Sequence, residues 1–380
     1  MLGHSRQGLL DLEHEPELPW RARDTPTWRL FWGKSVPVKD PFLVELLVSR
    51  PVQRLRRIGF LGAIDYLIHG NGQAPHQRRH NRFDHSVNVA LLALRYSMLR
   101  GLGQDETRLL AAAALLHDVG HGPLSHTLEP IFRKHFQIDH HRSSLAIVQG
   151  RSPLGDELPR IFRRHRVSLE GTIALLTGED KGPHAFLFDS PVNFDTIEAI
   201  ARCCFFAKTP RPVAPTDFID AIATRDTFPV DLADRFWTTK EVIYRTVIFS
   251  RRGLMADVLS QHFVKRSLQS FRMEDFFLDD VELRRKHPTL FKLLEHVRRH
   301  PSASGVESIP LDYDAVIDAG VRHFTVDTAQ TVHSSEDLPC RYRQRKENRE
   351  LSLKLLMGAG VQGRHLQGSL SNDGRTEGPD

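Results

Sequence analysis

Residues 105–126 read DETRLLAAAALLHDVGHGPLSH, and this stretch decides the fold that we expect. Its centre is apolar on every side, which is typical of a helix buried in the middle of a domain. The helix should end near Asp118, because two glycines and a proline follow it. His117 and Asp118 therefore stand side by side at the edge of an apolar core. A carboxylate in such surroundings costs free energy unless it is paired or binds a cation.

The sequence on both sides of this stretch is also mainly helical. Apolar residues recur with helical spacing in the segments 84–100, 140–150, 168–177, 194–207, 241–268 and 288–299. Strand signals are scarce outside residues 309–326. We therefore expect a mostly α-helical protein with little strand.

Changes in composition along the chain suggest how it is divided. The proline-rich segment KTPRPVAP (208–215) indicates a connection, and the polar, glycine-rich end indicates disorder. The expected parts are an N-terminal extension (1–35), a core domain (36–207), a helical extension that completes the core (208–300), a C-terminal α/β appendage (301–357) and a disordered tail (358–380).

The composition is that of a soluble globular protein, with 40% hydrophobic and 26% charged residues. No apolar run is long enough to span a bilayer, and the N-terminus lacks the pattern of a secretory signal. We therefore expect a cytoplasmic protein without a membrane partner. Cys203, Cys204 and Cys340 do not provide a disulfide framework or a zinc knuckle. The net charge of +5 suits an anionic ligand such as a nucleotide, and it leaves nucleic acid open as a partner.

Further donors for a cation stand elsewhere in the sequence. His85 lies in the first turn of the helix expected at 84–100, and Asp195 lies at the start of the helix expected at 194–207. Imidazole nitrogens and carboxylate oxygens together suit Mn²⁺, Fe²⁺, Ni²⁺, Zn²⁺ or Mg²⁺ rather than a thiolate-loving metal. A lone His-Asp pair is more often a helix end with an exposed acid. The prediction of a divalent metal ion therefore depends on these additional donors.

A set of segments, taken in order, resembles the HD-domain phosphohydrolase superfamily, and within it most closely the deoxynucleoside-triphosphate triphosphohydrolases. The segments are VKDPFLVELLVSRPVQRLRRIGFLG (38–62), RHNRFDHSVNVALL (79–92), LLHDVGHGPLSHTLEPIF (115–132), DHHRSS (139–144) and SPVNFDTIEAIAR (190–202). The resemblance covers residues from about 38 to 205. It implies that the core domain is an HD-domain helical bundle, with additional helices on its C-terminal side.

The resemblance also implies roles for individual residues. The implied metal ligands are His85, His117, Asp118 and Asp195. Arg82 matches an arginine that contacts substrate phosphate, a role that suits a guanidinium. The implied catalytic histidines are His121, His126 and His140, with His126 or His140 as the general acid. His141 competes with His140 for the same position in the match, and it is a further candidate for contact with the substrate.

The match departs from the triphosphohydrolases around the nucleotide pocket. Phe60 stands where the family has a glutamine that contacts the deoxyribose. Thr196, Ala199 and Cys203 stand where the eukaryotic members have a lysine, a tyrosine and an aspartate. A buried phosphate that loses such partners binds less tightly. We therefore expect an intact metal site beside an altered deoxynucleotide pocket.

The expected function is metal-dependent hydrolysis of a nucleotide phosphate bond, similar to that of a dNTP triphosphohydrolase. Water held by the metal attacks the phosphate, and a histidine protonates the leaving oxygen. One alternative is a phosphodiesterase or nuclease acting on nucleic acid or a cyclic nucleotide. Another is a nucleotide-binding regulatory protein with little turnover. The resemblance also leaves open assembly into a homo-oligomer.

Overall fold

The computed structural model describes residues 28–29, 35–36, 39–68, 80–209, 213–225, 227–300, 312, 314 and 316–358. Most of the expected N-terminal extension (1–35) and nearly all of the expected tail (358–380) lie outside these residues. Within the described part the protein is mostly helical, as the sequence predicts, and its strands form only two small antiparallel pairs.

The centre of the fold is a pair of buried helices, α4 (Arg82–Arg100) and α5 (Gln104–Leu116), which pack along each other. Every residue from Ala111 to Leu116 is fully buried, as the apolar sequence predicts. Shorter elements precede the pair: α1 (Pro41–Val48), α2 (Arg50–Arg54), η1 (Leu55–Arg57) and α3 (Ala63–Ile68).

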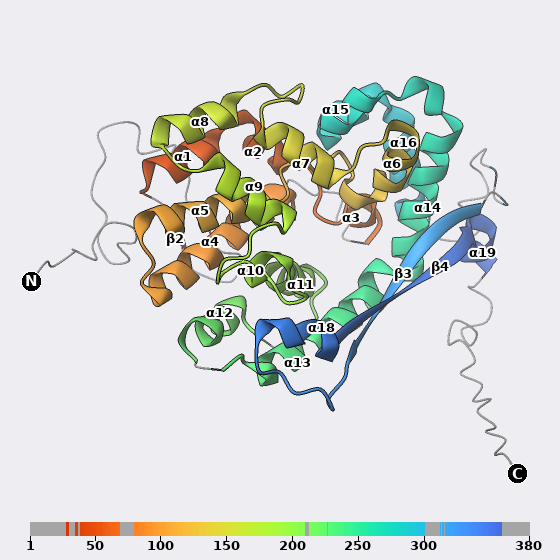
Figure 1. Cartoon of the computed structure of the whole chain (residues 1–380). Coiled ribbons are helices and arrows are strands. Elements are labelled where there is room, and N and C mark those ends of the chain that lie inside the picture. Colours follow the sequence, from red (N-terminus) through yellow and green to blue (C-terminus); the bar gives the residue numbers. More distant parts are fainter. Residues whose placement is uncertain are drawn as a thin grey trace, which may run out of the picture.

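Further helices follow this pair in the sequence (Figure 1). They are η3 (Ser125–Thr127), α6 (Glu129–Phe136), α7 (His140–Val148), α8 (Glu157–His165), α9 (Leu169–Thr177), α10 (Phe186–Asp189) and α11 (Phe194–Phe206). The helix α11 packs against α4. This contact brings two segments that are more than a hundred residues apart in the sequence to the same place.

The second half of the chain adds more helices: α12 (Pro215–Thr224), α13 (Val230–Ile243), α14 (Arg251–Arg266), η5 (Leu268–Ser270), η6 (Met273–Phe277), α15 (Asp280–Lys286) and α16 (Pro288–Arg299). The prediction of one helix over 241–268 is wrong, because a π-helical turn, η4 (Tyr244–Ile248), separates α13 from α14. Ser250 caps the new helix by accepting from the backbone N–H of Gly253. A Cβ at Gly253 would lie 2.2 Å from the carbonyl oxygen of Ile248, so only glycine permits this break.

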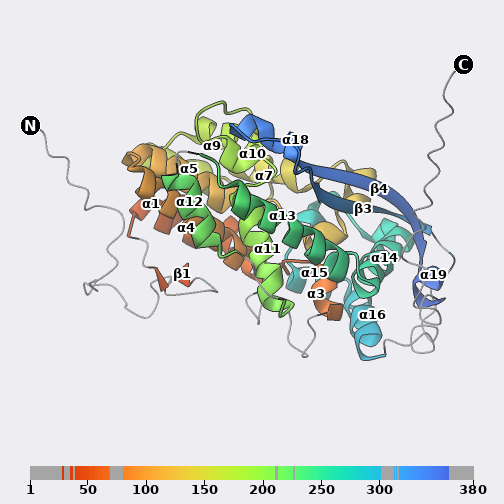
Figure 2. The same ribbon diagram turned by 90° about the horizontal axis from the view of Figure 1, so that it is seen from below.

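A two-stranded ribbon follows, in which β3 (Val316–Val326) pairs antiparallel with β4 (Tyr342–Ser352). It lies along α13 and α14 (Figure 2), and its other elements are η7 (Ser335–Asp337), α18 (Leu338–Arg341) and α19 (Leu353–Gly358). The sequence indicates β3 but not β4, because β4 is rich in charged residues and lacks regular apolar alternation. A second, very short pair joins β1 (Trp28–Arg29) to β2 (Ser35–Val36).

The buried apolar side chains of the described residues form one continuous core that extends from α1 to the ribbon. None of the helices in the described part of the chain combines the length and the apolarity needed to cross a membrane. The polar site described next lies where α4, α5 and α11 meet inside this core.

Candidate metal centre

Local structure places each of the four expected metal ligands at a helix end. His85 lies in the first turn of α4, whose N-cap is Asn81. His117 is the C-cap of α5, and Asp118 follows it. Asp195 lies in the first turn of α11, which begins with a capping box formed by Asn193 and Thr196.

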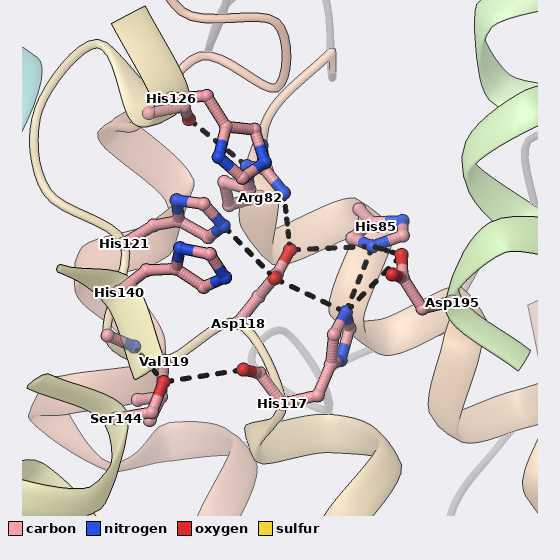
Figure 3. Close-up of polar contacts among 12 residues, drawn as sticks. Arg82, His85, His117, Asp118, Val119, His121, His126, His140, Ser144 and Asp195 are labelled. Atoms are coloured by element: carbon pink, nitrogen blue, oxygen red, sulfur yellow. Dashed lines mark hydrogen bonds and ion pairs between the residues drawn. The ribbon is translucent and has the colours of Figure 1, made fainter. Parts of the chain in front are cut away.

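The fold brings the four side chains together (Figure 3). The Nε2 atom of His85 lies 3.1 Å from Nε2 of His117 and 3.1 Å from Oδ1 of Asp195. Asp118 completes the group, with Oδ2 3.4 Å from Nε2 of His85 and Oδ1 3.4 Å from Nε2 of His117. The side chain of Asp195 is 46% exposed, so the group of donors is open to solvent on this side.

The outer nitrogens of the two imidazoles are already engaged. The Nδ1 atom of His117 donates to the carbonyl oxygen of Ala114 at 2.8 Å, and Nδ1 of His85 lies 2.5 Å from Oε2 of Glu198. Because both partners accept, both Nδ1 atoms carry the hydrogen and both Nε2 atoms present a lone pair. In the neutral rings these two lone pairs face each other at 3.1 Å and repel, so the pair favours either a shared proton or a metal ion between the two nitrogens. The residues therefore fit a divalent metal ion, and the nitrogen and oxygen donors suit a metal of the expected kind.

Glu198 contacts the expected ligand His85, and the sequence analysis missed it. It is fully buried and pairs with the equally buried Arg202, whose Nη2 lies 2.7 Å from Oε1. Its spacing offered a signal, because residues three apart on a helix share one face. Glu198 stands three residues after Asp195 and therefore points to the same site.

Opposite charges set the protonation of the ligands. Desolvation opposes the charged form of Asp195, but its contacts with His117 and His85 outweigh this effect and hold its pKa well below the ordinary value. Desolvation is likewise outweighed at Asp118, whose pKa is lowered by Arg82, His117 and His121. The two carboxylates in turn raise the pKa of His117 to about 9, against the effect of its burial. The centre thus strongly favours positive charge.

Arg82 lies directly beside the metal ligands. Its Nη1 donates to Oδ2 of Asp118 at 2.7 Å, and its Nε donates to Oγ of Ser125 at 3.1 Å. The guanidinium also packs on the ring of Phe60, with the carbon between its nitrogens 4.7 Å from the ring centroid. This arrangement places an arginine that can bind phosphate next to the centre.

The additional histidines gather on the other side of Asp118 (Figure 3). The Nε2 atom of His121 lies 3.2 Å from Oδ1 of Asp118, and the ring of His121 stacks on that of His140 with centroids 4.4 Å apart. The ring of His126 meets His121 edge-on at 4.6 Å. Burial, reinforced by Arg82, holds the pKa of His121 well below its ordinary value, so this imidazole stays neutral near pH 7.

Glu129 joins this histidine cluster, and the sequence analysis missed it as well. Its Oε2 lies 2.7 Å from Nδ1 of His140 and 3.3 Å from Nδ1 of His126. Desolvation raises the pKa of Glu129, but its two histidine partners outweigh this and lower it well below the ordinary value. His141 lies next to this cluster, and its ring centroid is 3.9 Å from that of His140.

The residues that depart from the triphosphohydrolase pattern also lie near the centre. The buried ring of Phe60 packs on His85, with centroids 4.7 Å apart. The Thr196 hydroxyl accepts from the backbone N–H of Asn193 in the capping box of α11. Cys203 is buried. These side chains provide packing and capping, and none of them offers a cation to a phosphate.

Comparison with known proteins gives a consistent result. Residues 82–197 match the family model described as HD domain. The uncharacterized protein YwfO of Bacillus subtilis is 35% identical over 139 residues, which cover 34% of this chain and 28% of that protein. The human deoxynucleoside triphosphate triphosphohydrolase SAMHD1 is 31% identical over 122 residues, or 29% of this chain and 18% of the human protein. The metal-dependent phosphohydrolase cns2 of Cordyceps militaris is 34% identical over 131 residues, or 34% and 32%.

These matches span only part of each relative. The aligned regions cover 28% of YwfO and 18% of human SAMHD1. The activities of the full-length relatives are therefore properties of those proteins, and for this chain they only suggest a proposal.

Proposed function

We propose that this chain, whose residues 82–197 form an HD domain of the phosphohydrolase superfamily, is a metal-dependent hydrolase of phosphate bonds. Part of the chain is also similar to the deoxynucleoside triphosphate triphosphohydrolase SAMHD1 of chicken and human. The observation that carries the proposal is the convergence of His85, His117, Asp118 and Asp195, with both Nε2 atoms turned inward toward the carboxylates.

A divalent cation held by these four side chains would supply Lewis acidity to the phosphoryl group and to the attacking water. The side chains that hold it are themselves held in place. Glu198 orients His85, and the carbonyl oxygen of Ala114 orients His117. Such hydrogen bonds to Nδ1 fix the tautomer and the orientation of each imidazole, and they increase the basicity of the Nε2 atom that would bind the metal.

Arg82 is the residue that we assign to the substrate phosphate. Its guanidinium bonds Asp118 through one nitrogen and Ser125 through another, which leaves further N–H groups for phosphate oxygens. A guanidinium held in this way needs little further ordering when the substrate binds. Arg82 therefore orients the phosphate beside the metal ligands and offsets its negative charge.

The proton for the leaving oxygen comes, in this proposal, from the histidine cluster. Glu129 accepts from Nδ1 of both His126 and His140, so it orients both rings. The side chain of His126 is 62% exposed, which favours it over the less exposed His140 as the group that meets a leaving oxygen. His121 bridges this cluster to Asp118.

We assign the substrate to the nucleotides, because the human relative is a deoxynucleoside triphosphate triphosphohydrolase. Phe60, Thr196 and Cys203 do not supply polar contacts to a deoxyribose, so the proposal extends to nucleotides other than dNTPs. Manganese is the metal that we choose for the first assay, because nitrogen and oxygen donors suit it and its aquo ion is soluble near pH 7.

The decisive experiment combines metal analysis with a substrate panel. The purified chain is loaded with Mn²⁺ and incubated separately with NTPs, dNTPs, nucleoside monophosphates, a cyclic nucleotide and single-stranded DNA. Release of tripolyphosphate identifies a triphosphohydrolase, and release of orthophosphate identifies a phosphatase. Opening of the cyclic nucleotide or shortening of the DNA would favour the phosphodiesterase or nuclease instead.

Asp118→Ala tests whether the centre is responsible. We expect it to lose metal binding and turnover while it stays folded. Asp156→Ala is the control, because that aspartate is 65% exposed and pairs only with Arg160 on the surface. Metal content and activity of the wild-type level in folded Asp118→Ala would rule the proposal out. Bound metal without turnover on the whole panel would favour a regulatory protein.

A further inference from the structure

The turn that follows the metal ligands has an unusual backbone. Leu124 and Ser125 both have positive φ angles, 56° and 47°, although neither is glycine. This left-handed conformation costs roughly 1–2 kcal/mol for each such residue. It persists only where the surroundings hold it. The contacts that hold Leu124 and Ser125 therefore decide how the turn is shaped.

One of these contacts comes from a residue that lies 156 positions later in the sequence. Asp280, the first residue of α15, is 2% exposed and accepts from the backbone N–H of Leu124 at 2.8 Å through Oδ1. Its Oδ2 accepts from the backbone N–H of Gly59 at 3.1 Å and from the Tyr66 hydroxyl at 3.3 Å. One buried carboxylate thus joins the turn at Leu124 to the backbone at Gly59.

Gly59 and the turn are also the two anchors of Ser125. The Ser125 hydroxyl donates to the carbonyl oxygen of Gly59 at 2.6 Å and accepts from Nε of Arg82 at 3.1 Å. The hydroxyl therefore uses its hydrogen as a donor to Gly59 and an oxygen lone pair as an acceptor from Arg82. If the distance between Gly59 and Leu124 changes, the hydroxyl loses one of its two partners. Asp280 fixes that distance.

The first half of the same turn has a separate support. The buried Arg54 donates through Nη2 to the carbonyl oxygens of Val119 at 2.9 Å and His121 at 2.7 Å. Through Nη1 it donates to the carbonyl oxygen of Leu278 at 2.9 Å. Arg54 thus holds the part of the turn that follows the metal ligands. Asp280 holds the part that contacts Arg82, so the two supports have separable effects.

We propose that Asp280 is a positioning residue for substrate phosphate, acting through Gly59, Leu124 and Ser125 on the guanidinium of Arg82. This inference rests on the proposed function, since it assumes that Arg82 binds phosphate. Asp280 and Gly59 both lie outside the matched segment 82–197. The HD segment alone therefore lacks a part of its phosphate site.

The test measures phosphate binding separately from metal binding. Asp280→Ala and wild type are compared, each loaded with Mn²⁺, by metal content and by calorimetric titration with inorganic tripolyphosphate. We expect unchanged metal content and a loss of tripolyphosphate affinity of about 10- to 100-fold, the range that one charge-assisted contact provides. With the best nucleotide of the panel, KM should rise more than kcat falls.

A double mutant shows whether the effect passes through Arg82. If it does, adding Asp280→Ala to Arg82→Ala should weaken tripolyphosphate binding by no more than about threefold further. Asp275→Asn is the matched control, because this buried carboxylate of the same segment binds Lys286 and the backbone N–H of Arg272 instead. We expect it to lower thermal stability without changing tripolyphosphate affinity.

Asp280→Asn covers the case in which Asp280→Ala does not fold. It keeps one oxygen for Leu124 but presents an N–H group toward Gly59, so its affinity should lie between wild type and the Arg82→Ala level. Wild-type affinity in a folded Asp280 variant, or a full independent loss in the double mutant, overturns the inference and leaves the proposed function standing. A wild-type chain that binds neither Mn²⁺ nor tripolyphosphate overturns both.

Discussion

At the scale of single residues, the centre depends on the groups behind the metal ligands as much as on the ligands. His85 and His117 present the same nitrogen because their other ring nitrogens are bonded to Glu198 and to the Ala114 carbonyl oxygen. The two supports differ in charge. Both partners orient the ring and increase its basicity, and the charged carboxylate does so more strongly than the neutral carbonyl oxygen.

Glu198→Gln tests this difference. The amide keeps the shape and one acceptor oxygen but removes the charge, so we expect about a 10- to 100-fold loss of Mn²⁺ affinity, measured by competition with a chelating dye. Stability should fall as well, because the buried Arg202 loses its charged partner. The exposed Glu170→Gln serves as the control for the charge change. Wild-type Mn²⁺ affinity in folded Glu198→Gln would show that the carboxylate plays no part in the site.

At the scale of secondary structure elements, the turn after Asp118 packs so closely against helix α7 that no additional side-chain atom fits between them. A Cβ at Gly120 would lie 2.2 Å from the carbonyl oxygen of His140 and 2.2 Å from the backbone nitrogen of Ser144. The hydroxyl of Ser144 also accepts from the backbone N–H of Gly120 at 2.9 Å. The glycine therefore sets how closely α7, and with it His140, approaches the centre.

Gly120→Ala should push α7 away from the turn. We expect a loss of stability of at least about 1–3 kcal/mol, measured by urea unfolding, together with a loss of activity. Gly103→Ala is the comparison, because a Cβ there meets nothing within 4 Å, and its cost should stay below about 1 kcal/mol. Equal stability of the two variants would contradict the tight fit that we describe.

A second link between elements depends on pH. Asp257 on α14 accepts from the Thr127 hydroxyl at 2.7 Å, and desolvation raises its pKa from 3.8 to about 7. Between these two values the folded protein binds a proton more readily than the unfolded chain, so this residue's contribution to stability falls as the pH rises through that window. It is lost above about pH 7.

Asp257→Asn isolates this contribution, since the amide oxygen can still accept from Thr127. We expect the variant to be more stable than wild type at pH 8 by on the order of 2 kcal/mol, because one pKa unit corresponds to about 1.4 kcal/mol and the group is partly solvated. At pH 4 the two proteins should differ little. Thermal melts at both pH values provide the measurement, and parallel curves for the two proteins would refute the assignment.

At the scale of the whole molecule, two consecutive helices and a third that lies far along the sequence contribute the ligands. The helix α4 supplies His85, the end of α5 supplies His117 and Asp118, and α11 supplies Asp195. A cation held by all of them binds the folded chain and not the unfolded one. Metal binding is therefore coupled to the stability of the whole fold.

Mn²⁺ should accordingly raise the melting temperature. At a free concentration 100 times its Kd it contributes about 2.7 kcal/mol, which corresponds to a shift of several degrees for a protein of this size. A chelator should reverse the shift, and Asp118→Ala should show none. Scanning calorimetry with and without Mn²⁺ gives the measurement. A shift of wild-type size in Asp118→Ala would place the metal elsewhere.

Local sequence was enough to predict the main helices. The apolar run before His117 marks a buried helix. Caps and apolar spacing predict helices over 84–100 and 194–207, and the structure has them over 82–100 and 194–206. The resemblance to a known family named the ligands, and the fold brings those residues together. Their roles in binding and catalysis stay predictions until the variants are measured.

The tertiary structure decided what depends on contacts between distant segments. Glu198 supports His85 across 113 residues, and Asp280 reaches Leu124 across 156. The neighbouring sequence does not identify the group to which either carboxylate is hydrogen-bonded. A hydrogen bond over such a separation forms only when the chain has packed. The strand β4 was missed for the same reason, since its charged sequence becomes a strand through pairing with β3.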